Sequence, residues 1–155
     1  MTPMMRGFVP VASAARRAIR AIVGEEADCS PSEVSLAILG VPPSIVVPWG
    51  DATIGGFGLS RILSAAQLVR VEARAAKLWP PGPYALGAVA AEAVKAIVQG
   101  SRGPLNVLTV LTGEFGVRGG VGVVPSFLGP GGISRTRVPP LDAKERTSLE
   151  TALQA

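Results

Sequence analysis

The feature that most constrains the fold is a set of three apolar stretches near the C-terminus, separated by short glycine-containing turns. Residues 106–112 alternate near a period of two, and residues 121–128 and 133–138 form two more apolar runs. The intervening segments 113–116 and 129–132 are rich in glycine and predict turns. Strands joined by such short turns run antiparallel, because a parallel crossover needs a dozen or more residues. The sequence therefore predicts an antiparallel sheet in this part of the chain.

The N-terminal half predicts one helix and two shorter strands. Apolar residues recur near every 3.6 positions over residues 11–23, which is typical of an amphipathic helix, and Gly24 is a natural C-terminal stop. Buried strands are expected over residues 34–39 and 44–48. Pro42-Pro43 separates them and predicts a tight, stiff turn, because two adjacent prolines exclude a helical backbone.

Three further helices are expected, over residues 60–78, 84–99 and 143–153. A glycine-rich bend over residues 51–58 precedes the first of them, and Ser60 is its predicted N-cap. The last helix follows Asp142, which is expected to form a capping box with Glu145. Strands and helices therefore occur in separate runs rather than in regular alternation. This order predicts an α+β fold, an antiparallel sheet with helices packed against it.

Length and composition predict one folded domain. The chain has 155 residues, of which 48% are hydrophobic, so it can bury a core. We divide it into an N-terminal lead-in over residues 1–10 and a single domain over residues 11–155. No apolar run reaches the roughly 18 residues of a membrane span, and the lead-in lacks the features of a secretory signal. A cytoplasmic location without membrane contact is therefore expected. Cys29 is the only cysteine, which excludes an internal disulfide and a Cys/His metal site.

The formal net charge of +4 is carried mainly by arginine. The basic residues cluster on two predicted helices, with Arg16, Arg17 and Arg20 on the first and Arg70, Arg74 and Lys77 on the second. Such faces can attract phosphates or acidic partners, and a nucleic-acid-binding module is one alternative. No aromatic side chains interleave with these charges as a stacking platform requires. We therefore expect solvated helix faces and no nucleic-acid partner.

Several short motifs follow one another in a characteristic order. A Gly-x-Phe-Gly turn spans residues 113–116, a Val-Pro-x-x-Leu-Gly strand spans residues 124–129, and Leu141 and Glu145 mark the entry to the last helix. Upstream, residues 39–48 begin with Leu-Gly and end with Val-Pro. These motifs resemble the C-terminal, substrate-binding half of the lactate/malate dehydrogenase family, over nearly the whole chain. The resemblance implies the fold of that domain and an origin in carboxylic acid metabolism.

The resemblance also implies where the family's catalytic groups fall. The family's proton-transferring histidine belongs to a "Leu-Gly-x-His-Gly-Asp" loop, and its position here falls on Pro42. The aspartate that orients this histidine falls on Ala12, and the arginine that clamps the substrate carboxylate falls on Ala15. The chain contains no histidine at all. Because the three groups act as a unit, their joint absence predicts a pseudoenzyme that has lost 2-hydroxyacid dehydrogenase catalysis.

Four residues are candidate substitutes for the missing groups. Arg16 or Arg17 would take the role of the clamp if the register shifted by one or two residues, but each step turns the side chain by about 100° around the helix. Asp51 and Glu114 are candidate replacement bases, although an ordinary surface or turn carboxylate is the favoured interpretation of each. Catalytic residues are therefore not assigned.

The NAD-binding Rossmann half of the family is not recognised in this sequence. The glycines at 55, 56 and 58 and those at 120 and 122 do not complete a Gly-x-Gly-x-x-Gly pattern at the start of a helix. We therefore expect no cofactor and no metal in this chain, and NAD only if a Rossmann partner exists. The first hypothesis is a domain that acts by binding or assembly, as a homo-oligomer or with a separately encoded Rossmann-domain protein. The alternative is the substrate-domain subunit of a split NAD-dependent malate/lactate oxidoreductase that such a partner completes.

Overall fold

The computed structural model describes residues 5–8, 10–78 and 82–154 of the chain. The helices are α1 (Pro10–Ala27), α2 (Leu59–Ile62), α3 (Ala65–Ala75), α4 (Pro83–Gln99) and α5 (Ala143–Gln154), with short 3-10 turns η1 (Pro31–Glu33) and η2 (Glu114–Gly116). The strands are β1 (Met5–Phe8), β2 (Val34–Ser35), β3 (Leu39–Val41), β4 (Ser44–Val46), β5 (Thr53–Ile54), β6 (Phe57–Gly58), β7 (Leu105–Thr112), β8 (Arg118–Gly129) and β9 (Gly132–Thr136).

The described strands form two antiparallel sheets, as the sequence predicts. The larger sheet has six strands, in which β1, β7, β8, β3 and β4 are neighbours in that order and β9 pairs with β8. β7 and β8 make its longest pair, from Leu105 opposite Ser126 to Thr112 opposite Arg118. The smaller sheet contains β2, β5 and β6. The predicted α+β class is therefore confirmed.

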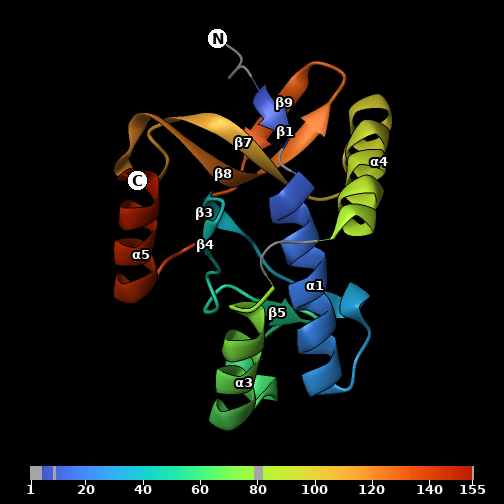
Figure 1. The fold of residues 1–155 in the computed structure, drawn as a ribbon, viewed down its shortest axis with the longest axis vertical. Helices are drawn as coiled ribbons and strands as arrows, with labels where there is room; N and C mark the ends of the chain where they lie inside the picture. Colours follow the sequence, from blue (N-terminus) through green and yellow to red (C-terminus); the bar gives the residue numbers. More distant parts are fainter. Residues whose placement is uncertain (1–4, 9, 79–81, 155) are drawn as a thin grey trace.

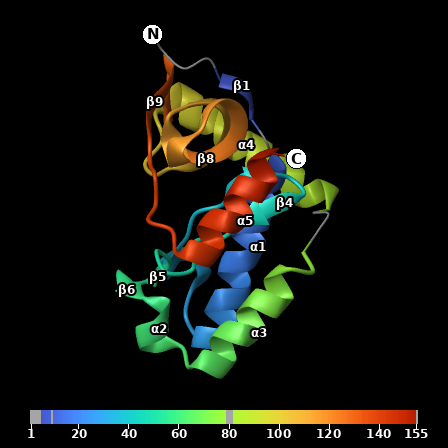
Figure 2. The same cartoon turned by 90° about the vertical axis from the view of Figure 1, so that its left-hand side faces the viewer.

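One long helix connects the two sheets. α1 runs from the six-stranded sheet down to the smaller one, with α4 beside its upper part and α3 beside its lower part (Figure 1). α5 covers β3 and β4 and also contacts β8 (Figure 2). Three groups of buried apolar side chains hold this arrangement together, and they lie between α1, α3 and the small sheet, between α4 and β7–β9, and between α5 and the β3–β4 hairpin.

The first helix is longer than predicted, because Gly24 does not end it. α1 continues to Ala27, and Asp28 ends it with a positive φ of 53°. The chain then folds back, so that the Cys29 N–H donates to the Gly24 carbonyl at 2.9 Å. A Cβ on Gly24 would lie 2.8 Å from the Cys29 carbonyl oxygen. The glycine is thus needed for this close approach, one turn before the helix end.

The predicted helix over residues 60–78 is in fact two helices, and Ser60 is not its N-cap. Leu63 is extended between α2 and α3, and Ser64 caps α3. The Ser64 hydroxyl accepts from the Gln67 N–H at 3.3 Å, and the Gln67 side chain accepts from the Ser64 N–H at 2.9 Å. This capping box starts a new helix inside a continuous apolar pattern. Residues 79–83 separate the predicted helices over 60–78 and 84–99, and of these residues 79–81 lie outside the described residues.

The capping box predicted for the last helix is confirmed. The Glu145 N–H donates to Asp142 Oδ1 at 2.7 Å, and the Asp142 N–H donates to Glu145 Oε2 at 3.0 Å. Glu145 is also buried, and its Oε1 accepts from the Trp49 N–H at 2.9 Å. The cap therefore ties α5 to the loop that follows β4.

Three segments with short strands differ from the prediction. Residues 5–8 of the predicted lead-in form β1, which pairs with β7; the rest of that lead-in, apart from Pro10 at the start of α1, lies outside the described residues. The predicted strand over residues 34–39 divides into β2 and β3, which belong to different sheets. The bend over residues 51–58 contains the β5–β6 hairpin. Strands of two or three residues give too short an alternation to be read from sequence.

Candidate functional site

The elements expected to carry the family's catalytic groups meet at a small pocket. It has a volume of about 160 Å³ and is lined by Ala15 of α1, by Pro43 and Ile45 of the β3–β4 hairpin, and by Ala75, Ala76 and Leu78 at the end of α3. All of these side chains are apolar. None of them can accept a proton or form an ion pair with a carboxylate. No side chain in the pocket can be charged, and its polar surface comes from the backbone.

The three predicted catalytic positions lie at or beside this pocket and in the core below it. Ala15 lines the pocket and is 2% exposed. Pro42 is half-buried in the hairpin turn, next to the pocket residue Pro43. Ala12 is fully buried and belongs to the apolar core between α1 and α3. Segments distant in sequence are therefore brought together, as expected from the resemblance, but with side chains that carry no charge.

The β3–β4 hairpin is held in place independently of any catalytic group. Gly40 has a φ of 98°, and a Cβ there would collide with the Ser44 carbonyl oxygen. Gly40 pairs with Ile45 within the hairpin and with Val123 of β8. Only glycine allows the turn at this close approach. The frame of the loop is therefore intact although its expected chemistry is absent.

The two arginines considered as substitute clamps point away from the apolar pocket. Arg16 donates from Nε to the Leu36 carbonyl and from Nη1 to the Pro104 carbonyl, both at 3.1 Å. Arg17 is exposed, and its Nη1 lies 3.9 Å from Glu92 Oε2. Neither lines the pocket that Ala15 lines. The turn of about 100° per residue separates the faces of α1, as expected.

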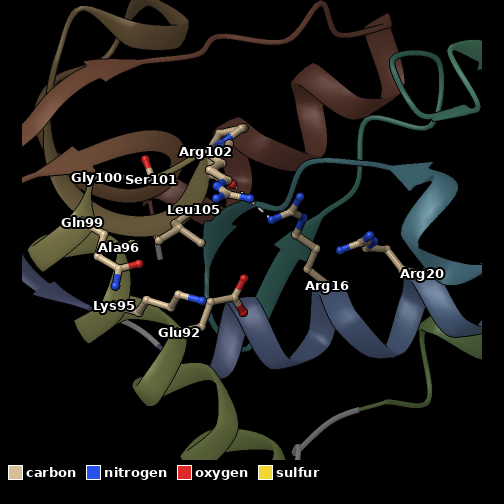
Figure 3. Close-up of a pocket in the computed structure, with 12 residues that line it drawn as sticks. Arg16, Arg20, Glu92, Lys95, Ala96, Gln99, Gly100, Ser101, Arg102 and Leu105 are labelled. Atoms are coloured by element: carbon tan, nitrogen blue, oxygen red, sulfur yellow. Dashed lines mark hydrogen bonds between the residues drawn. The ribbon is translucent and has the colours of Figure 1, made fainter.

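Arg16 lies instead beside a basic cavity between α1, α4 and the loop after α4. Figure 3 shows Arg16 and Arg20 extending from α1, Lys95 and Glu92 from α4, and Arg102 from the loop. Burial and the charge of Arg20 lower the pKa of the Arg16 guanidinium, and Glu92 offsets this only in part. Sequence reasoning missed this cavity, because Lys95 and Arg102 are distant in sequence from Arg16. The four-residue spacing of Arg16 and Arg20 on one helix face was the only signal.

The two carboxylates considered as replacement bases are engaged elsewhere. Asp51 forms an ion pair with Arg137 at 2.8 Å. Glu114 accepts a hydrogen bond from the Thr112 N–H at 2.6 Å. Burial raises the pKa of Glu114, but hydrogen bonds from the backbone of Glu114 and Thr112 outweigh it and leave the pKa below its ordinary value. Neither carboxylate lines the apolar pocket.

Two members of the second basic group, Arg70 and Arg74, form ion pairs with α1. Arg70 Nη2 lies 2.9 Å from Glu26 Oε2, and Arg74 Nη2 lies 2.5 Å from Glu25 Oε2. Both carboxylates belong to the last turns of α1. These arginines therefore tie α3 to α1, while their side chains remain 56% and 44% exposed, in keeping with the expected solvated face.

The glycines considered for dinucleotide binding do not fit that role. Gly55 and Gly56 connect β5 to β6, and Gly120 and Gly122 lie within β8. None of them stands between a strand and the start of a long helix, where a pyrophosphate is bound. Within the described ranges, no cluster of three or more His, Cys, Asp or Glu side chains is placed to hold a metal ion. Among the described helices, none has the length and apolar character needed to cross a membrane.

Comparison with known proteins shows sequence similarity to malate dehydrogenases. A scan against protein-family models finds no match. The chain is 31% identical to malate dehydrogenase of Cytophaga hutchinsonii over 142 residues, which is 86% of this chain and 46% of the relative. The chain thus spans about half the length of the curated relatives it matches.

Solved structures of malate and lactate dehydrogenases share the fold of this chain. Malate dehydrogenase of Salinibacter ruber is 26% identical, with a TM-score of 0.80 over 92% of this chain and 50% of that one. The ligand-free minor L-lactate dehydrogenase of Enterococcus mundtii is 20% identical, with a TM-score of 0.85 over 97% of this chain and 53% of that one. At 20% identity, the comparison with the lactate dehydrogenase shows a shared fold and nothing more.

Proposed function

We infer that this chain, which corresponds in sequence and fold to the C-terminal half of the lactate/malate dehydrogenases, does not carry out their 2-hydroxyacid redox reaction and acts by binding or assembly. The observation that carries this inference is the apolar pocket lined by Ala15, where the resemblance places the carboxylate clamp, and by Pro43, the neighbour of the histidine position Pro42. The absence of histidine from all 155 residues supports it.

The chemistry of a 2-hydroxyacid dehydrogenase makes two demands on this place in the fold. A base must take the hydroxyl proton as hydride leaves the carbon, and a cation must hold the substrate carboxylate. The apolar pocket meets neither demand, because its walls are alanine, proline, isoleucine and leucine. Asp51 and Glu114 do not replace the base, since each is held by other partners.

Assembly is supported by the exposed face of α4. Exposed apolar or small residues recur along this helix at alternating steps of three and four: Tyr84, Gly87, Ala91, Val94 and Val98. Tyr84 is 94% exposed, Val94 62% and Val98 71%. This spacing places all five on one face of the helix and is the spacing of a helix-to-helix seam.

The opposite face of α4 is already buried. Val89, Ala93 and Ala96 of that face are at most 8% exposed, and α4 packs against α1 and β8. A helix that is apolar on both faces is normally covered on both. We propose that a second copy of this chain covers the exposed seam, because identical seams with this spacing can pack against each other about a two-fold axis.

Size-exclusion chromatography with light scattering tests the assembly. We expect a dimer or larger species, and we expect Val94→Glu with Val98→Glu to convert it to a monomer, since both place a carboxylate in the seam. Val69→Glu is the matched control, because Val69 is 66% exposed on α3. A wild-type chain that is monomeric at high micromolar concentration would contradict assembly through α4.

The second candidate is a split malate/lactate oxidoreductase. It is supported by the match to about half of each related dehydrogenase. In this case NAD and the missing proton carrier come from a Rossmann-domain partner. Mixing the chain with such a partner, NADH and a panel of 2-oxo acids distinguishes the two candidates. Turnover above that of the partner alone supports the split enzyme, and its absence supports the non-catalytic domain.

A further inference from the structure

A basic cavity opens between α1, α4 and the loop that follows α4. Its volume is about 330 Å³, and its charged lining residues are Arg16, Arg20, Glu92, Lys95 and Arg102. An adjoining hollow of about 450 Å³ shares four of these and adds Ser13 and Arg17. Both the cavity and the adjoining hollow have volumes in the range of small-molecule binding sites.

The charge of this cavity is not balanced by its own walls. Four lining side chains are cationic, and Glu92 is the only carboxylate among them. The nearest basic nitrogen to Glu92 belongs to Arg17, at 3.9 Å. In the part of the chain that the structure describes, no ion pair forms within 4.0 Å at Arg20, Lys95 or Arg102. The cavity therefore has a net positive charge that an anion would neutralise.

Arg16 is fixed in a position suited to binding. Two carbonyl oxygens, of Leu36 and Pro104, each accept one of its N–H groups at 3.1 Å. A guanidinium has five N–H donors, so three remain available. Its pKa is lowered by burial and by the charge of Arg20, which indicates that the cation lacks a full counter-charge. Little side-chain entropy would be lost when this group binds a ligand.

Ser13 gives a second, independent sign of a ligand. Its side chain is 6% exposed and lines the adjoining hollow. Its Oγ has no hydrogen-bond partner among the described residues. A buried hydroxyl is normally paired, because an unpaired one costs about 1–3 kcal/mol. The Oγ has less than 1 Å² of accessible surface, so an oxyanion in the hollow accepts this hydrogen bond only when the neighbouring side chains move aside.

We propose that this cavity binds the phosphate group of a small soluble molecule. Three arginines line it, and the planar guanidinium forms paired hydrogen bonds with phosphate oxygens. The loop after α4 contributes Ser101 and two flanking glycines, Gly100 and Gly103, which leave the backbone open to close approach. The site is separate from the apolar pocket, which lies on the Ala15 face of α1. It therefore does not rest on the proposed loss of catalysis.

Isothermal titration of the full chain with inorganic phosphate and pyrophosphate, at constant ionic strength, tests this proposal. We expect saturable binding of both, tighter for pyrophosphate. Arg20→Gln and Arg102→Gln should each weaken binding at least about tenfold, since each removes a charged hydrogen-bond donor. Arg146→Gln is the matched control, because it removes an exposed arginine on α5, outside the cavity.

Three results would overturn the proposal. The first is no saturable binding of either anion. The second is an equal effect of Arg102→Gln and Arg146→Gln, which would show that the anions respond only to overall charge. The third is tighter binding of citrate than of pyrophosphate, which would assign the cavity to carboxylates. Circular dichroism of each variant checks that the fold is retained.

Discussion

Replacing Ala15 by arginine would place the family's carboxylate clamp at the position that the resemblance assigns to it. Ala15 is 2% exposed and lines an apolar pocket of about 160 Å³. We expect Ala15→Arg to destabilise the fold, because the guanidinium would enter a space that offers it no carboxylate. If this pocket were a preserved substrate site, the same arginine would be tolerated.

The expected cost follows from the surroundings of the side chain. An unpaired charge left in a protein interior costs about 3–5 kcal/mol. The pocket is open on one side, so the long side chain can extend partly toward solvent, and we expect about 3 kcal/mol. For a chain of this size each kcal/mol lowers Tm by about 2–4 °C. The predicted loss is therefore about 6–12 °C.

Thermal and urea unfolding of Ala15→Arg and Ala15→Met measure this effect. Methionine has a similar length without the charge and can extend into the pocket of about 160 Å³, so we expect it to cost less than arginine. Equal stability of the two variants would refute the reasoning. A rise in the Tm of Ala15→Arg with added malate, absent from Ala15→Met, would also refute it, because the pocket would then still accept a carboxylate.

Two further predictions concern the contacts that hold the helices. Glu145→Ala should lower the free energy of unfolding by about 2 kcal/mol, since the half-buried Trp49 N–H loses its charged acceptor. Glu150→Ala, at an exposed position on the same helix, should change it by less than about 0.5 kcal/mol in urea titrations. The hydrogen bond from Arg70 lowers the pKa of Glu26, so its contribution to stability is complete above the ordinary pKa of glutamate, about 4.3, and is lost as pH falls through the lower folded pKa. Urea midpoints measured from pH 6 to pH 3 should therefore fall less in Glu26→Gln than in the wild type, and parallel curves would contradict this.

Local signals in the sequence predicted much of the fold. The antiparallel sheet of β7, β8 and β9 follows from alternation and glycine turns. The β3–β4 hairpin follows from two apolar runs around Pro42-Pro43, and the cap of α5 follows from Asp142 and Glu145. Each of these features is decided by residues that lie close together in the chain.

Where a predicted helix or strand boundary is wrong, the cause is a tertiary contact or a competing local signal. Gly24 resembles a helix stop, yet it is needed where Cys29 folds back onto α1. Ser64 starts a new helix through its capping box with Gln67, where apolar periodicity predicts continuity. β1 is too short to be recognised and is defined by its pairing with β7. In each case the boundary is set by a contact that the periodicity of apolar residues does not reveal.

The two pockets differ in how far the sequence could reveal them. The place of the apolar pocket could be anticipated, because the resemblance puts one catalytic position on Ala15 and another on Pro42, next to the lining residue Pro43. The basic cavity was not expected, because Arg20, Lys95 and Arg102 come from three separate segments. Charge clusters of this kind appear only when the helices are packed.

We propose that this chain lacks the dehydrogenase reaction of its relatives. The most direct measurement is NADH oxidation with oxaloacetate, in a mixture of the purified chain and the Rossmann half of a related malate dehydrogenase. We expect no turnover above that of the Rossmann half alone, at any concentration of the chain. Turnover that rises and saturates with the concentration of the chain would contradict the claim and would establish the split enzyme instead.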